Sequence, residues 1–288
     1  MNNLKKLKTN NLMELRKTTL HKKYKLKDQG DMPKYTVLEF RPKKTPYCLC
    51  IPVINEGQRI KRQLEKLRKY TNVVDVLLLD GGSIDGSTTP EFLKKNKVRA
   101  LLVKKSKGWQ ATQLRMGFGY AIKQGYSGII QIDGNNKDSV SSIPLFIKAL
   151  EQGFDYVQGS RFINGGRGIN TPLSRELGIR LLMSPLLSLA AGHRYTDVTN
   201  GFRAYSARYL AHPKVRPFRK IFQKYSLNFY LCVRANQIGL STKEVPVGRR
   251  YPAGKVPTKI TGIRKNFDIF LEALKAALGI YNPEHESF

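Results

Sequence analysis

The chain has 288 residues, of which 41% are hydrophobic, enough for the core of one or two domains. Its formal net charge is +30, from 51 Lys/Arg and 21 Asp/Glu. This charge favours anionic partners: nucleic acid, an anionic membrane surface or phosphate-rich small molecules. The three cysteines show neither CxxC spacing nor a His/Cys cluster, which argues against a zinc site. As unpaired thiols they favour a reducing cytoplasm.

Residues 1–46 are polar and lysine-rich, with 13 Lys/Arg against 4 Asp/Glu, so a net charge of +21 falls on the remainder. We expect a solvated basic arm; the alternative is a membrane-surface helix with Leu4, Leu7, Leu12 and Leu15 on one side. The first residues lack the apolar region of a signal peptide, and the longest apolar run, 181–191, is too short to cross a bilayer. The sequence therefore predicts a soluble or surface-bound protein.

Strand and helix patterns alternate from residue 47 onward. The expected strands are 47–53, 73–80, 98–103, 129–133, 156–159 and 241–247. The expected helices are 56–70, 90–97, 110–124, 142–151, 173–191, 227–238 and 263–278. This alternation predicts an α/β fold with a mostly parallel central sheet and helices on both faces, as in Rossmann-like nucleotide-binding domains.

Three of these strands end in polar loops, at IPVINEG, DGGSIDGS and DGNNKD. The carboxyl ends of parallel strands are where ligands bind, so the side chains of Asn55, Glu56, Asp80 and Asp85 are candidates for a nucleotide site. Ordinary turn and helix-start chemistry explains the same residue types. Neither GxGxxG nor GxxxxGK[ST] is matched, which disfavours classical dinucleotide binding and P-loop hydrolysis.

In DGNNKD, Asp133 and Asn135 lie two residues apart and offer carboxylate and amide oxygens. Mg²⁺ or Mn²⁺ accepts such oxygens together with diphosphate oxygens and water. A turn rich in Asn and Asp is the alternative interpretation.

Several motifs occur in a fixed order: IPVINE, DGGSIDGS, DGN, GSRF, DVTNGFRAYS, and EVPV followed by RRYPAGKVPTK. In this order and spacing they resemble the family-2 glycosyltransferases of GT-A fold, closest to the dolichyl- or polyprenyl-phosphate sugar synthase branch. The resemblance covers about residues 47 to 260. We therefore expect a GT-A domain over 47–260, preceded by the basic arm over 1–46 and followed by a C-terminal amphipathic helix and tail over 261–288.

The resemblance implies an inverting transfer from a nucleoside-diphosphate-sugar, with Asp133 and Asn135 at the metal. The implied donor contacts are Pro52, Asn55, Glu56, Asp80, Gly82, Asp85, Gly108, Asp133, Gly134 and Asn135. Lys255 and Arg249 or Arg250, on the late basic loop, are candidates for closing over the diphosphate; the alternative is that they belong to the general basic surface. Two positions depart from the family pattern. Gly81 replaces the second acid of DDGS, and Asn135 replaces the last acid of DxD, so base contacts and metal dependence are both in question.

For the acceptor, Arg161 and Arg175 match positions where the synthase branch holds the lipid phosphate. An ionised phosphate needs positive clamps more than a base, and a guanidinium suits it better than an ammonium. A sugar-hydroxyl acceptor instead requires a base, for which Asp197 is the candidate. The other interpretation of Asp197 is that it caps the loop or pairs with Arg203.

Two other functions fit parts of the sequence. Charge alone would suit a nucleic-acid-binding protein, but no recognition motif supports one. A sugar-phosphate nucleotidyltransferase would need a Gly-rich phosphate loop near the N-terminus, which is absent. The basic surface also predicts peripheral attachment to an anionic cytoplasmic leaflet, at about 1 kcal/mol per basic residue. The base, the sugar, the acceptor and the oligomeric state are left open.

Overall fold

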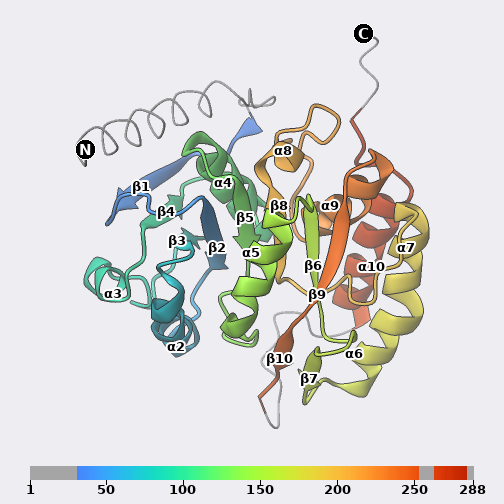
Figure 1. The fold of residues 1–288 in the computed structure, drawn as a ribbon, viewed down its shortest axis with the longest axis horizontal. Coiled ribbons are helices and arrows are strands. Elements are labelled where there is room, and N and C mark those ends of the chain that lie inside the picture. Colours follow the sequence, from blue (N-terminus) through green and yellow to red (C-terminus); the bar gives the residue numbers. More distant parts are fainter. Residues whose placement is uncertain (1–30, 253–262, 284–288) are drawn as a thin grey trace, which may run out of the picture.

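The computed structural model describes residues 31–252 and 263–283. Its centre is an eight-stranded sheet of order β1-β4-β3-β2-β5-β8-β6-β9 (Figure 1). The strands of this sheet are β1 (Tyr35–Glu39), β2 (Tyr47–Val53), β3 (Asp75–Asp80), β4 (Ala100–Lys104), β5 (Gly128–Gln131), β6 (Tyr156–Ser160), β8 (Arg203–Ser206) and β9 (Thr242–Pro246). The pairs formed by β4, β3, β2 and β5 are parallel, as is β6 with β9, whereas β1 and β8 run antiparallel to their neighbours.

Helices cover both faces of this sheet. They are α2 (Gln58–Leu67), α3 (Pro90–Lys95), α4 (Gln110–Lys123), α5 (Ile143–Glu151), α6 (Leu173–Gly178), α7 (Ser184–Ala191), α8 (Ala207–Leu210), α9 (Ser226–Gln237) and α10 (Ile263–Ala277). Short 3₁₀ turns, Arg68–Tyr70 and Val140–Ser142, extend α2 and precede α5, and a π-helical segment, Ile179–Met183, joins α6 to α7. Among the described residues, no helix has the length and apolarity needed to cross a membrane.

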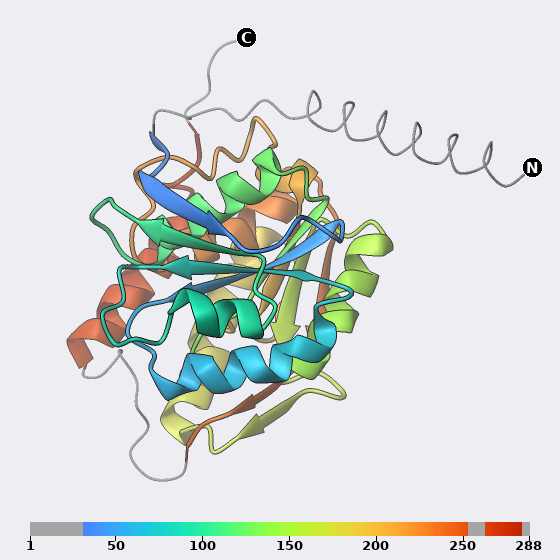
Figure 2. The same cartoon turned by 90° about the vertical axis from the view of Figure 1, so that its left-hand side faces the viewer.

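The sheet is buried from both sides, which explains why its central strands read as continuous apolar runs. Along β2, Leu49 and Ile51 pack into the core under α2, α3 and α5, whereas Cys48 and Cys50 pack into the core under α4, α7, α9 and α10. Figure 2 shows these layers from the side of β1, with α2 and α3 on one face and α4 on the other. The predicted α/β class with a mostly parallel sheet is confirmed.

The structure corrects several element predictions. Residues 35–39 form edge strand β1 and belong to the sheet, so a basic arm extending to residue 46 is wrong for this segment. The alternating pattern of this strand, YTVLE, is short and lies in a lysine-rich stretch, so the sequence alone did not indicate a strand. Strand β8 lies in the polar motif DVTNGFRAYS, where no strand was predicted. The alternative of a membrane-surface helix, with Leu4, Leu7, Leu12 and Leu15 on one side, concerns residues outside the described part of the chain.

A second, two-stranded sheet pairs β7 (Arg167–Ile169) in parallel with β10 (Gly248–Arg250). Strand β10 also contacts the loop after β5, because Ser139 N donates to Gly248 O at 2.8 Å and Arg250 N donates to Lys137 O at 2.8 Å. Residues 248–250 therefore connect the loop after β5 with β7, the strand that follows β6 in the chain.

Candidate active site

The loops that follow β2 and β3 are tied together by hydrogen bonds. Asn55 N donates to Ser83 Oγ at 3.0 Å, and Ile84 N donates to Asn55 Oδ1 at 2.9 Å. Gly57 N donates to Asp85 Oδ2 at 2.7 Å. Burial tends to raise the pKa of Asp85, but bonds from Ser87 and Gly57 outweigh it, so the net pKa is lowered. Two predicted donor loops thus form one surface.

Asp80 organises its own loop. Its Oδ1 accepts from Gly82 N at 3.1 Å, Ser83 N at 2.8 Å and Ser83 Oγ at 2.7 Å, and Oδ2 accepts from Thr88 Oγ1 at 3.2 Å. The side chain is buried. Gly82 has φ +98°, a conformation that suits glycine at this turn. These hydrogen bonds agree with the alternative interpretation of Asp80, in which its side chain stabilises a tight turn. A bound nucleotide would contact the loop that Asp80 stabilises. Glu56 forms an ion pair with Arg59 at 3.0 Å.

The Asp133 carboxylate lies directly after β5, partly open to solvent. Gln110 Nε2 donates to its Oδ1 at 3.3 Å, and Asn135 Nδ2 and Arg249 Nη2 approach its Oδ2 at 3.4 and 3.3 Å. Glycines shape this site: a Cβ at Gly134 would lie 3.0 Å from the Pro52 carbonyl oxygen, and one at Gly201 would lie 2.7 Å from Asp133 Oδ1. The Gly201 backbone can approach the carboxylate only because this position lacks a side chain, and Gly134 lets the loop after β5 pack against the end of β2.

These residues fit a divalent ion with a single protein carboxylate. The hydrogen bonds to Asp133 are long, so its oxygens keep capacity for a hard cation. Asn135 contributes less, because its Oδ1 accepts from Lys137 N at 3.1 Å and its amide nitrogen faces Asp133. Within residues 31–252 and 263–283, no cluster of three or more His, Cys, Asp or Glu side chains is placed to hold a metal. Diphosphate oxygens and water would have to complete the coordination of such an ion.

Two glutamines, missed in the sequence, support the loops of this site. Gln63 Nε2 donates to Asp133 O at 2.9 Å and its Oε1 accepts from Asn136 N at 2.8 Å. Gln113 Nε2 donates to Val53 O and Leu79 O, both at 2.7 Å. Gln63 lies on the apolar face of α2, and a polar side chain on a buried helix face is a signal that could have identified it.

Arg249 forms an ion pair with the Asp133 carboxylate. Its Nη1 donates to Asp138 Oδ2 at 2.5 Å, while its Nη2 lies 3.3 Å from Asp133 Oδ2. Burial by itself lowers the pKa of Arg249, but Asp138 and Asp133 raise it well above its ordinary value. A permanent positive charge therefore stands beside the expected metal ligand. Lys255, the other predicted diphosphate cation, lies outside the described residues.

Tyr251, two residues after Arg249, lies among the predicted acceptor arginines. Arg175 Nη1 donates to its hydroxyl at 3.3 Å and Arg161 Nη1 at 3.5 Å. The Lys137 Nζ lies 5.0 Å from the ring centroid. Burial raises the pKa of Tyr251, but the arginines more than offset this, so its net pKa falls below the ordinary value. An aromatic residue inside the basic motif RRYPAGK was the available signal in the sequence.

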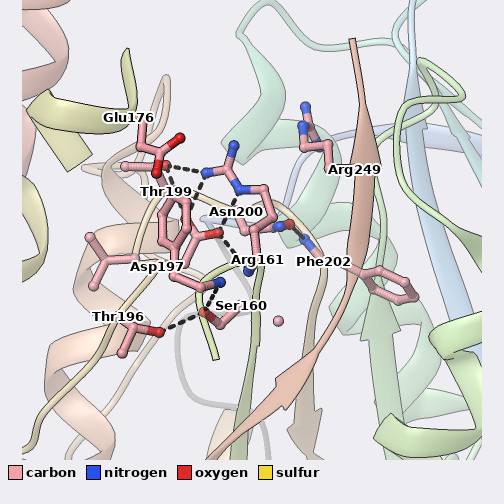
Figure 3. A network of polar contacts seen from close by, with 12 residues as sticks. Ser160, Arg161, Glu176, Thr196, Asp197, Thr199, Asn200, Phe202 and Arg249 are labelled. Atoms are coloured by element: carbon pink, nitrogen blue, oxygen red, sulfur yellow. Dashed lines mark hydrogen bonds and ion pairs between the residues drawn. The ribbon is translucent and has the colours of Figure 1, made fainter. Parts of the chain in front are cut away.

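Figure 3 shows how Asp197 holds Arg161. Arg161 Nε donates to Asp197 Oδ2 at 2.6 Å and its Nη2 donates to Oδ1 at 2.8 Å, in a pair withdrawn from solvent. The loop of Asp197 is fixed by Glu244, which accepts from Thr196 N at 2.9 Å and Asp197 N at 3.3 Å. Arg203 instead donates to the carbonyl oxygens of Val198, Asn200 and Asn228, so its predicted pairing with Asp197 is wrong.

The predicted residues thus fall into two groups that the 248–251 segment joins. One group lies on the ends of β2 and β3 and on the loops after β2, β3 and β5, and comprises Pro52, Asn55, Glu56, Asp80, Gly82, Asp85, Asp133, Gly134 and Asn135. The other consists of Arg161, Arg175 and Asp197. Gly108, at the start of α4, accepts a hydrogen bond from Lys104 Nζ at its carbonyl and has φ +131°.

Solved structures share this fold. Glucosyl-3-phosphoglycerate synthase from Mycobacterium tuberculosis, solved with Mn²⁺, UDP-glucose and phosphoglyceric acid, aligns with TM-score 0.58 and 15% identity, covering 81% of this chain and 78% of that chain. A crystal structure described only as that of a mycobacterial protein aligns with TM-score 0.59 and 14% identity, covering 86% of this chain and 83% of that chain. These similarities confirm the GT-A type of the α/β fold.

Two proteins with similar sequences are named as a mannosyltransferase and a monophosphomannose synthase. An undecaprenyl-phosphate mannosyltransferase of Micrococcus luteus is 26% identical over 200 residues, covering 68% of this chain and 80% of its own. A polyprenol monophosphomannose synthase of Mycolicibacterium smegmatis is 26% identical over 200 residues, covering 68% and 74%.

The model of glycosyl transferase family 2 matches residues 48–212, more than half of the chain. This match spans the loops after β2, β3 and β5 and the arginines of the second group. The chain belongs to glycosyl transferase family 2.

Proposed function

We propose that this enzyme transfers a sugar from a nucleoside-diphosphate-sugar to a polyprenyl phosphate, with inversion at the anomeric carbon. The observation that carries the proposal is the segment 248–251. It places Arg249 against the Asp133 carboxylate and Tyr251 between Arg161 and Arg175. A site for a leaving diphosphate and a site for an attacking phosphate are thereby joined through two residues of one segment.

The donor would lie over the joined loops after β2 and β3, with its diphosphate toward Asp133. A divalent cation on Asp133 would supply Lewis-acid stabilisation of the negative charge on the leaving nucleoside diphosphate. Arg249 adds a fixed positive charge at the same place without any reorganisation during the reaction. The UDP-sugar and Mn²⁺ named for the structural neighbour support this class of donor.

The burial of Asp197 favours a phosphate acceptor over a sugar hydroxyl. A general base must reach the proton that it removes, but Asp197 is fully buried and both its oxygens bind Arg161. A phosphate oxygen is already ionised near neutral pH and needs no base. Two guanidiniums suit such an acceptor: that of Arg175 is partly exposed, and that of the buried Arg161 keeps its Nη1 edge directed towards Tyr251 beside Arg175. The relatives named as acting on undecaprenyl phosphate and polyprenol support the same choice.

In the proposed reaction, an acceptor phosphate oxygen forms a bond to the anomeric carbon as the bond from that carbon to the diphosphate oxygen breaks. The nucleoside diphosphate leaves with the electron pair. Attack and departure on opposite faces invert the anomeric configuration. A product that retained the donor's configuration, measured by NMR, would exclude this single displacement.

The first test is thermal unfolding with UDP, GDP, CDP and dTDP, each with and without Mn²⁺, for the wild type and Asp133→Ala. A ligand at a hundredfold over its dissociation constant adds about 2.7 kcal/mol of stability. We expect stabilisation by one diphosphate, enlarged by Mn²⁺ and reduced in Asp133→Ala. Equal shifts with all four nucleotides, or none, would contradict a specific donor site. If neither Mn²⁺ nor the mutation changed the shift in unfolding temperature, the assignment of Asp133 as a metal ligand would be rejected.

The second test is transfer of labelled sugar from the selected donor to undecaprenyl phosphate and, separately, to a free oligosaccharide. We expect product only with the phosphate. Transfer to the oligosaccharide alone would replace the acceptor class while leaving the donor site intact.

A further inference from the structure

The continuous helix formed by α6, the π-helical segment and α7 exposes an apolar face. Five leucines lie on it, with exposed fractions from 46% at Leu177 to 86% at Leu189. They are Leu173, Leu177, Leu181, Leu182 and Leu189. The opposite face, with Ile179, Met183 and Leu187, is buried in the core. We call the five leucines the leucine face.

This face differs from that of the surface helix α2. In α2, which is also amphipathic, the exposed positions are Gln58, Arg62, Glu65 and Lys66, all polar. Such a face is what a solvated helix normally shows. An exposed run of leucines on one helix instead marks an interaction surface.

The leucine face adjoins the proposed acceptor site. Arg175 lies between Leu173 and Leu177 and donates to the Tyr251 hydroxyl. The guanidinium carbon of Arg180, about one turn further along the helix, lies 4.1 Å from the ring centroid of Phe162. Phe162 directly follows Arg161 in the sequence. The leucines and the partly exposed Arg175 are therefore on one surface, and the buried Arg161 shares the Tyr251 hydroxyl with Arg175.

The charges around the leucine face are positive. Over residues 173–194 the chain has Arg175, Arg180 and Arg194 against the single acid Glu176, which pairs with Arg180 at 2.9 Å. Exposed leucines flanked by cations match the interface of an anionic leaflet, where apolar side chains enter the acyl boundary and cations meet the headgroups.

We propose that the leucine face docks on the surface of an anionic phospholipid bilayer. This inference rests on the proposed function, since it names the membrane from which the acceptor phosphate would be presented to Arg161 and Arg175. Docking would place Arg175 at headgroup level, with Arg161 behind it and the acceptor's apolar tail left in the bilayer.

The test uses the full chain with vesicles of phosphatidylcholine alone and of phosphatidylcholine with 30% phosphatidylglycerol, in a co-sedimentation assay. The test variant is the double substitution Leu181→Gln and Leu189→Gln. The matched control is Leu38→Gln, an exposed leucine on β1, the edge strand of the sheet away from α7 (Figure 1). All substituted side chains are exposed, so folding should be retained, and circular dichroism checks this.

We expect the wild type to bind the anionic vesicles, and the double variant to bind at least about tenfold more weakly because two leucines no longer enter the acyl boundary. Leu38→Gln should bind as the wild type does. Unchanged vesicle binding in the double variant would overturn the proposal and attribute binding to charge alone. The proposal would also be overturned if sedimentation velocity showed that the wild type is a dimer, and if the double variant lost the dimer while its vesicle binding stayed the same.

Enzyme assays separate this inference from the proposed function. Transfer to a short, water-soluble isoprenyl phosphate should be equal in all variants, whereas transfer to undecaprenyl phosphate in vesicles should fall with vesicle binding. Leucine-dependent vesicle binding without transfer to either phosphate would support the docking face and refute the acceptor. Equal transfer from vesicles by the wild type and the double variant would count against the docking face.

Discussion

Arg161 donates from Nε and Nη2 to the two oxygens of Asp197, at 2.6 and 2.8 Å, and both side chains are buried. This bidentate pair leaves Nη1 as the edge of the guanidinium that faces Tyr251. Asp197 thereby sets the direction in which Arg161 presents its remaining donors. We interpret Asp197 as a positioning residue for Arg161, the arginine proposed to bind the acceptor phosphate.

Asp197→Asn should raise the acceptor KM strongly, by about 10-fold or more, because Arg161 loses its charged partner and its orientation. The stability loss should reach about 3–5 kcal/mol, since a buried guanidinium is left uncompensated. Steady-state kinetics and urea unfolding measure the two effects. The pH profile of kcat should keep its shape; loss of its acidic limb in the variant would instead identify Asp197 as a base.

Asp155→Asn is the matched control for this substitution. Asp155 is also a buried acid in an ion pair, with Arg208 at 2.6 Å, but Arg208 is largely exposed. The variant should lose stability and keep the acceptor KM. A comparable rise of KM in both variants would show that destabilisation alone explains the effect of Asp197→Asn.

Arg249→Ala should weaken both folding and donor binding. It leaves Asp138 buried without its cation, at a cost of about 3–5 kcal/mol, and removes the fixed charge beside Asp133. Arg250→Ala is the control, because Arg250 is exposed on the same strand, β10. Isothermal titration with the selected nucleoside diphosphate should show weaker binding in Arg249→Ala only. Equal losses in the two variants would reduce Arg249 to part of the general basic surface.

Much of this arrangement could be predicted from the sequence because it depends on local patterns. The buried run DVLLLD and the acid at its end predicted β3 and its loop, and the spacing of Asp133 and Asn135 identified the loop after β5. The contacts of Arg249 with Asp138 and of Tyr251 with Arg175 join residues more than 70 positions apart. No local pattern encodes such pairs, so they had to come from the structure.

The role of Asp197 shows a second limit of the sequence. A carboxylate in a polar motif reads equally well as a base, a cap or an ion-pair partner, and burial is what separates these roles. The motif DVTNGFRAYS also contains Arg203, which lies closer in sequence than Arg161 and was therefore the natural partner to expect. In the fold, strand pairing of β6 with β8 brings the end of β6, and with it Arg161, to Asp197.

Tyr251→Phe should remove a phenol whose pKa is lowered in the fold. The pKa of Tyr251 lies below its ordinary value of 10.0, because nearby arginines outweigh the effect of burial. A lowered pKa means that the phenolate stabilises the fold above the unfolded pKa, and that this contribution is lost as pH falls through the folded pKa. The wild type should therefore gain stability over Tyr251→Phe as pH rises towards 10.

Absorbance at 295 nm, with urea unfolding at pH 8 and pH 10, measures both effects. The difference between the two titration curves should lie on the acidic side of pH 10. A difference curve centred above pH 10 would mean that the arginines do not control this phenol.

Gln63→Ala should loosen the loop that carries Asp133 without touching the carboxylate itself. Gln63 bridges Asp133 O and Asn136 N from the buried face of α2, and each buried group left unpaired costs about 1–3 kcal/mol. A less rigid loop holds its carboxylate less precisely, so the affinity for Mn²⁺ in the presence of the diphosphate should fall. Gln58→Ala, at an exposed position of the same helix, should change neither stability nor Mn²⁺ affinity. If Gln63→Ala lost stability but bound Mn²⁺ as tightly as the wild type, Gln63 would support the fold alone.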